Sequence, residues 1–234
     1  MSISPLFVIV LGFAPGIIWV WYFYREDTWE PEPKKLIAKM FLYGTIIALP
    51  VLFLETPFLF SELLLAVVAA PIIEELFKFV AVRFSVYKNK EFNEPIDGII
   101  YACTAALGFA SIENTFYLFS FFNEGIIAFT AFFIVRALLS VPAHALFSSM
   151  WGYALGIAKY RVKSKRLIIL GGLITAMVLH SLYNFLLTGL LIGAVGMLIF
   201  IPFLWLLVHK KIRELLNKSP YAADSANEEK IGEQ

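Results

Sequence analysis

Seven apolar runs, each long enough to cross a lipid bilayer, constrain the fold of this chain more than any other feature. A transmembrane helix needs about 20 apolar residues to cross a hydrocarbon core of about 30 Å. The sequence therefore predicts an all-α, polytopic transmembrane helix bundle with about seven spans. The fifth run is longer than one crossing requires, which predicts a tilt or a break near Pro142. The runs lie at residues 3–24, 38–56, 60–82, 97–122, 126–158, 167–188 and 190–208.

Composition supports this class. Hydrophobic residues make up 60% of the chain and charged residues 16%, whereas soluble domains have about 45–50% and about 25%. The lipid bilayer is therefore an expected partner, and the net charge of +1 argues against a nucleic-acid partner. Because Cys103 is the single cysteine, an intrachain disulfide and a zinc site built on a cysteine pair are excluded.

The basic residues predict the orientation. They follow the first, third, fifth and seventh runs, and the turns after the other runs carry none. Of 19 basic residues, Lys78 and Arg136 alone lie outside these four loops. The positive-inside rule then places the N-terminus outside and the C-terminus in the cytoplasm. We expect one membrane-embedded domain over residues 1–213 and a flexible cytoplasmic tail over residues 214–234.

Ionisable and amide side chains within the spans are the candidate functional residues. Five of them carry a full charge, and at about 2.5–3.5 kcal/mol each they could cost on the order of 10 kcal/mol in the bilayer. They come from four runs and fall near mid-membrane, where we expect them to surround a hydrated cavity. The set is Glu74, Glu75 and Lys78 on the third run, Glu113 and Asn114 on the fourth, Arg136 and His144 on the fifth, and His180 and Asn184 on the sixth.

Helical spacing adds detail to this set. Lys78 is four residues from Glu74 and three from Glu75, so it can pair with either. Adjacent helical residues point about 100° apart, so one glutamate at most should face the centre and Lys78 should pair with the other. His180 and Asn184 are four residues apart and share a helix face.

Two classes of function use such residues. A carboxylate can activate water for peptide hydrolysis while histidines or an amide stabilise the oxyanion, or carboxylates and histidines can relay protons in a transporter. We find no repeat of the kind that many transporters carry. There is no HExxH motif, so the signal for zinc is weak and no cofactor or metal ligand is predicted. Asp97, at the start of the fourth run, is expected to be an N-cap, and Gly152 to Gly156 should allow close helix contact.

Four short motifs carry a resemblance to a known family. "EELFK", "GFASIEN", "PAH" and "HSLYN" occur in this order on successive runs. This order resembles the PrsW intramembrane protease family, a glutamic-type family distantly related to the CAAX prenyl endopeptidases. The stretch "APGIIWVWYFYREDTWEPEP" is similar to that family as well, and the resemblance extends to about residue 210. The CAAX enzymes have FxxxH where this chain has FxxxE, from Phe109 to Glu113, which argues against prenyl-protein processing.

The resemblance implies a site-1 protease that cleaves a single-pass anti-sigma factor on its outer side. A proton-coupled transporter and a zinc-dependent CAAX-like membrane peptidase stay as alternatives. By analogy, Glu74 is preferred over Glu75 as the base that activates water, and Glu113 shares that water. His144 and His180 are expected to stabilise the oxyanion or protonate the leaving amine. The supporting residues would be Asn184, which orients, Asn114, and Lys78 and Arg136, which balance charge.

Overall fold

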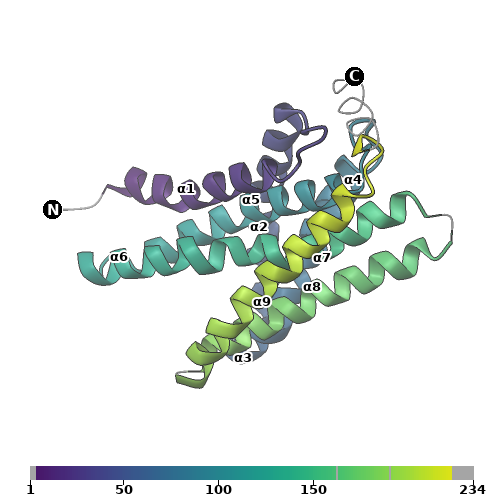
Figure 1. The fold of residues 1–234 in the computed structure, drawn as a ribbon. Helices are drawn as coiled ribbons and strands as arrows, with labels where there is room; N and C mark the ends of the chain where they lie inside the picture. The colour runs from purple at the N-terminus through teal and green to yellow at the C-terminus, as the bar shows by residue number, and fades with distance from the viewer. Residues whose placement is uncertain (1–3, 162, 190, 223–234) are drawn as a thin grey trace.

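The computed structural model describes residues 4–161, 163–189 and 191–222, and within these residues all regular structure is helical (Figure 1). The predicted all-α bundle is thus confirmed. Five elements are uninterrupted α-helices: α1 (Pro5–Tyr24), α2 (Lys34–Glu55), α5 (Asp97–Ser120), α8 (Lys165–Thr188) and α9 (Leu191–Leu216). A short 3-10 turn, η1 (Thr56–Phe58), follows α2. Two longer helices are each built from three consecutive pieces. The first consists of α3 (Glu62–Leu64), η2 (Leu65–Ala69) and α4 (Ala70–Ser85). The second consists of α6 (Ile126–Val135), η3 (Arg136–Ser140) and α7 (Val141–Lys159).

Six helices in the described part of the chain are long and apolar enough to span a membrane. They correspond to the predicted runs except the third, residues 60–82. That run is helical from Glu62 to Ser85, but Glu74, Glu75 and Lys78 lie inside it. Seven predicted spans therefore become six apolar helices and one helix that carries charge. The side chains of Glu74, Glu75 and Lys78 are buried inside the protein rather than turned toward lipid.

Helix α5 forms the centre of the bundle. Every residue from Asp97 to Ser111 is buried, and α5 packs on α1, α2 and α7. A Cβ atom on Gly98 would lie 2.2 Å from the carbonyl oxygen of Gly152, and one on Gly156 would lie 1.9 Å from that of Pro95. The predicted close approach at Gly152 and Gly156 is thus confirmed, because the α5–α7 crossing has no room for larger side chains.

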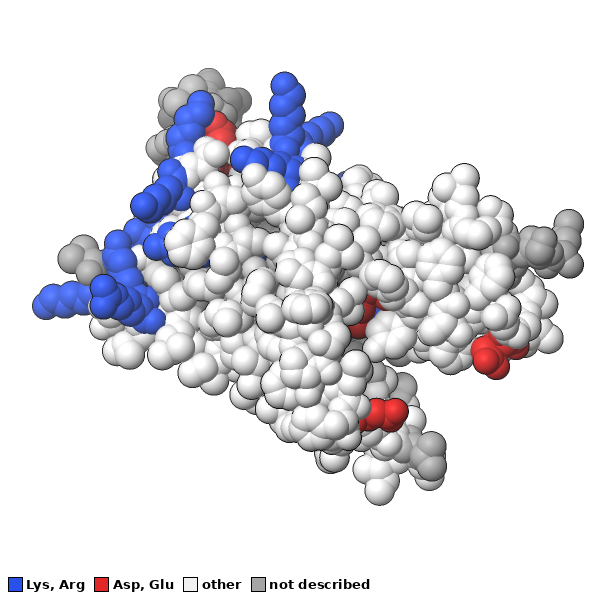
Figure 2. Space-filling view, turned by 180° about the vertical axis from the view of Figure 1, so that it is seen from behind, with Lys and Arg blue, Asp and Glu red and all other residues white. Residues whose placement is uncertain are grey.

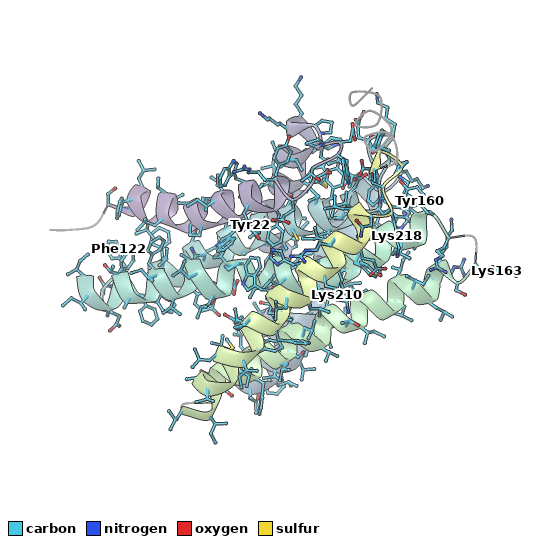
Figure 3. All side chains as sticks on the ribbon, in the orientation of Figure 1. Tyr22, Phe122, Tyr160, Lys163, Lys210 and Lys218 are labelled. Carbon is cyan, nitrogen blue, oxygen red and sulfur yellow. The ribbon has the colours of Figure 1, made fainter. Side chains whose placement is uncertain are left out.

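The two ends of the bundle differ in charge. Figure 2 shows Lys and Arg gathered at one end of an otherwise largely uncharged body. In Figure 3, Lys163 and Tyr160 lie toward this end, and Phe122 lies at the opposite one. This separation agrees with the alternation of basic loops. Which end faces the cytoplasm remains a prediction.

Helix α9 extends past the predicted end at residue 208, to Leu216. Ile212 and Leu215 are buried, and the Tyr153 hydroxyl on α7 donates to Glu214 at 2.8 Å. This packing against α7 continues the helix where the sequence turns polar. The first residues of the predicted tail are therefore helical, and residues 223–234 lie outside the described part of the chain.

The helix with the glutamate pair contains a π turn, η2, directly before Pro71. In a π turn each carbonyl accepts from the amide five residues later. For Ala66 that residue is Pro71, which has no N–H. The side chain of Asn184 on α8 supplies the missing donor, with Nδ2 at 2.7 Å from the Ala66 oxygen.

The second long helix repeats this arrangement at η3, directly before Pro142. The carbonyl of Ala137 would pair with Pro142, and the indole Nε1 of Trp19 on α1 donates to it at 2.9 Å instead. The predicted irregularity near Pro142 is therefore a π turn, and the helix continues through it. Both π turns lie beside the candidate site.

Candidate active site

The predicted residues converge on a cavity of about 530 Å³. The cavity extends to Glu55, Ser120 and Thr188, at the ends of α2, α5 and α8 that lie away from the basic loops. Figure 2 shows acidic side chains inside a hollow in the uncharged body. Six of the nine predicted site residues line the cavity: Glu74, Glu113, Arg136, His144, His180 and Asn184.

Glu75 lies behind the cavity wall and is fully buried. One carboxylate oxygen lies 3.0 Å from Lys78 Nζ and 3.3 Å from His180 Nδ1. The other accepts from the Ser148 hydroxyl at 2.7 Å and from the Trp151 indole at 2.9 Å. A carboxylate has about four acceptor positions, so Glu75 is saturated and has no position left for a water molecule.

Glu74 is the member of the pair that lines the cavity. Its Oε2 accepts from Lys78 Nζ at 2.9 Å. The expectation that Lys78 pairs with one glutamate alone is wrong, because its ammonium group has three donors and reaches both carboxylates. Lys78 Nζ also lies 3.0 Å from His144 Nδ1.

The two histidines approach the cavity from α7 and α8. Since a carboxylate only accepts, His180 Nδ1 must donate to Glu75, which leaves His180 Nε2 with a free lone pair. Glu74, His144 and His180 place one ligand atom each within 4.8 Å of one another, and no other such group of three occurs in the described part of the chain. These residues could hold a metal ion.

Glu113 occupies the opposite side of the cavity. Its Oε2 lies 2.8 Å from His144 Nε2 and 3.4 Å from Arg136 Nη2, yet no hydrogen bond of good geometry satisfies it within the described residues. Arg136 is held in place, because its Nε donates to Asn114 Oδ1 at 2.9 Å and its guanidinium lies over the Tyr117 ring. Asn114 is fully buried and so supports the site through Arg136.

Sequence reasoning did not identify Ser148, Trp151 or Trp19 as part of this region. A usable signal existed for the first two, since Ser148 and Trp151 lie four and seven residues after His144 and share its helix face. Trp19 gave no such signal, because its partner is a carbonyl group freed by a distant proline.

Comparison with known proteins identifies the family. Residues 32–207, which include every predicted site residue, match the family described as PrsW family intramembrane metalloprotease. The chain belongs to this family. It is therefore a protease, and a multi-pass protein of a bacterial cell membrane that functions in a lipid bilayer.

Relatives named Protease PrsW support the assignment along most of the chain. The protein of Geobacillus kaustophilus is 35% identical over 212 residues, which cover 88% of this chain and 91% of the relative. That of Oceanobacillus iheyensis is 32% identical over 89% of this chain and 95% of the relative. That of Bacillus subtilis is 33% identical over 85% of this chain and 90% of the relative. No solved structure matches the chain.

Proposed function

We propose that this PrsW-family protease hydrolyses peptide bonds at a zinc centre held by Glu74, His144 and His180. The observation that carries the proposal is the convergence of these three side chains within 4.8 Å. Two imidazoles and one carboxylate form a known ligand set of catalytic zinc. When bound, zinc polarises a carbonyl group and makes a water molecule more acidic.

The charge balance around the cavity supports a metal ion. Glu74, Glu75 and Glu113 bring three negative charges, and Lys78 and Arg136 bring two positive ones. With neutral histidines the group has a formal charge of minus one, which is unfavourable at membrane depth. A divalent ion would supply the positive charge that this group lacks.

The remaining side chains have distinct roles in this proposal. Glu113 would accept a proton from cavity water, since its carboxylate lines the cavity opposite Glu74. Arg136 orients Glu113, with Nη2 at 3.4 Å from its Oε2. Glu75 orients His180, as a carboxylate behind a metal-bound histidine does. Asn184 acts on the cavity wall through Ala66, rather than on the reacting group.

The cavity also suggests the direction from which the substrate arrives. His180 lies eight residues before Thr188, so the centre is about 12 Å below the end of α8. We infer that a single-pass membrane protein presents its scissile bond from this end. The family resemblance suggests an anti-sigma factor, cut as the first step of regulated intramembrane proteolysis.

The test measures cleavage and bound zinc together, with purified protein and a single-pass substrate in liposomes. Glu74→Gln, His144→Ala and His180→Ala should lose both cleavage and zinc. Glu113→Gln should keep zinc and lose about 10²–10⁴-fold in rate, the range for a general base. Glu124→Gln, an exposed control, should keep both. One zinc per chain in Glu74→Gln, together with normal cleavage, would refute the proposal.

A further inference from the structure

A second group of buried carboxylates lies at the basic end of the bundle. We call it the acidic cluster: Asp27, Glu30, Glu32, Glu94 and Asp97. Its members come from the loop between α1 and α2, the loop between α4 and α5, and the first residue of α5. All except Glu30 have at most 2% of their surface exposed. Since α5 rises about 1.5 Å per residue, Asp97 is about 24 Å from Glu113, so this cluster is separate from the active site.

Several carboxylate oxygens of this cluster have no well-formed hydrogen bond in the described part of the chain. Both oxygens of Asp27, Glu32 Oε1 and Asp97 Oδ1 are buried and lack a hydrogen bond of full geometry to the described residues, and the Glu32 and Asp97 carboxyl groups lie within reach of each other. Asp97 Oδ2 accepts from the Glu94 amide at 2.7 Å, and the Tyr101 hydroxyl donates to Glu32 Oε2. Asp97 is thus the first residue of α5 and not its N-cap, which is Ile96.

Charge repulsion should disperse this cluster unless something compensates it. The charges that act most strongly on Asp27 are those of Asp97, Glu94 and Glu30. In the described part of the chain, no Lys or Arg forms an ion pair with any member. Lys159 is near, but its Nζ donates to the carbonyl oxygens of Tyr87 and Phe92.

We propose that the acidic cluster binds a hydrated hard divalent cation, Mg²⁺ or Ca²⁺, which Asp27, Glu32 and Asp97 contact directly or through its bound water. The donors are all oxygen, which such ions prefer. These three carboxylates do not form a group whose ligand atoms all lie within 4.8 Å of one another, so the ion would keep part of its water shell, as Mg²⁺ commonly does. The ion ties the α1–α2 loop to the start of α5. The site is independent of the proposed zinc chemistry.

Thermal unfolding of the purified full-length protein tests this proposal. At a concentration of 100 Kd, Mg²⁺ or Ca²⁺ should raise the melting temperature by roughly 5–10 °C over a chelator. KCl at the same ionic strength should have no such effect. The double variant Asp27→Asn, Glu32→Gln should melt above the wild type in chelator, because it removes buried repulsion, and should no longer respond to the ion.

Two further variants distinguish ion binding at the acidic cluster from ion binding at the active site. Glu74→Gln should keep the full response, and so should the exposed control Glu124→Gln. Electron paramagnetic resonance with Mn²⁺ should count one bound ion in Glu74→Gln and none when the Asp27→Asn and Glu32→Gln changes are added. A response equal to that of KCl, one that survives in the double variant, or one lost in Glu74→Gln would overturn the proposal. None of these outcomes depends on cleavage activity.

Discussion

The active site and the acidic cluster both bury several carboxylates, but they compensate the charge in different ways. Within the active site, Lys78 donates to two glutamates, and Glu75 has a partner at every acceptor position. The acidic cluster has no ion-paired Lys or Arg among the described residues, and both oxygens of Asp27 lack a hydrogen bond of full geometry.

The environment explains this difference. The active site lies at membrane depth, where an uncompensated charge is costly, and most of its charge is balanced by neighbouring side chains of the protein. At the basic end of the bundle, loops meet an aqueous phase that contains cations. We therefore expect the stability of the active site to depend on which side chains surround its carboxylates. The stability of the acidic cluster should depend on the divalent cations in the solution.

The largest effect is expected from Lys78→Met, which removes the cation that pairs Glu74 and Glu75. Breaking a buried ion pair from one side costs about 3–5 kcal/mol, so the free energy of unfolding should fall by this amount in chelator. Added zinc should restore part of the lost free energy of unfolding. The stability of the active site would then depend on an added ion, as we expect for the acidic cluster. Chemical denaturation with and without zinc measures this change. An unchanged free energy of unfolding in chelator would show that Lys78 compensates no buried charge.

A pH titration should sharpen the contrast further. Burial, followed by the charges of Asp97, Glu94 and Glu30, raises the pKa of Asp27 from 3.8 to about 8. Burial and Asp97 raise that of Glu32 to about 10, although the hydrogen bond from Tyr101 opposes the rise. Because the folded pKa values lie above the unfolded ones, stability in chelator should be complete below about pH 4. It should fall as the pH rises through 8 toward 10.

Saturating Mg²⁺ should reduce the decrease in stability with rising pH. Asp27→Asn should reduce this decrease even in chelator. Melting temperatures recorded from pH 4 to 10 under both conditions provide the comparison. Stability in chelator that increases across this range would mean that the Asp27 and Glu32 carboxylates are compensated by groups of the protein itself.

The smallest effect is expected from Ser148→Ala, which removes one of four partners of Glu75. A hydrogen bond to a charged group contributes about 1.5–3 kcal/mol, and Lys78, His180 and Trp151 remain as partners of Glu75. Cleavage should decrease through misorientation of His180, with zinc still bound but more weakly. Ser149→Ala on the next position, whose hydroxyl donates to the Leu146 carbonyl instead, is the matched control. Equal zinc affinity in both variants would exclude the orienting role of Glu75.

Much of the membrane fold could be predicted from the sequence, because apolar length and basic loops report directly on spans. The convergence of Glu74, Glu113, His144 and His180 was predictable for a related reason, since isolated charges in apolar runs must find one another. The preference for Glu74 over Glu75 came from the family resemblance and not from helix spacing, because the outcome depends on where α7 places Trp151. The acidic cluster could not be predicted from the sequence either, since loop residues become buried only through tertiary packing.

The two π turns have a consequence for how the cavity wall can move. If η2 rewound into ordinary α-helix, Leu65 and Ala66 would rotate by about 100° relative to Glu74 and shift by about 1.5 Å. They would leave the cavity wall while the carboxylate stayed in position. Asn184 contributes a single hydrogen bond against this change. Faster amide exchange over residues 62–66 in Asn184→Leu would show that this hydrogen bond holds η2 in the cavity wall, and that the wall can change shape without displacing Glu74.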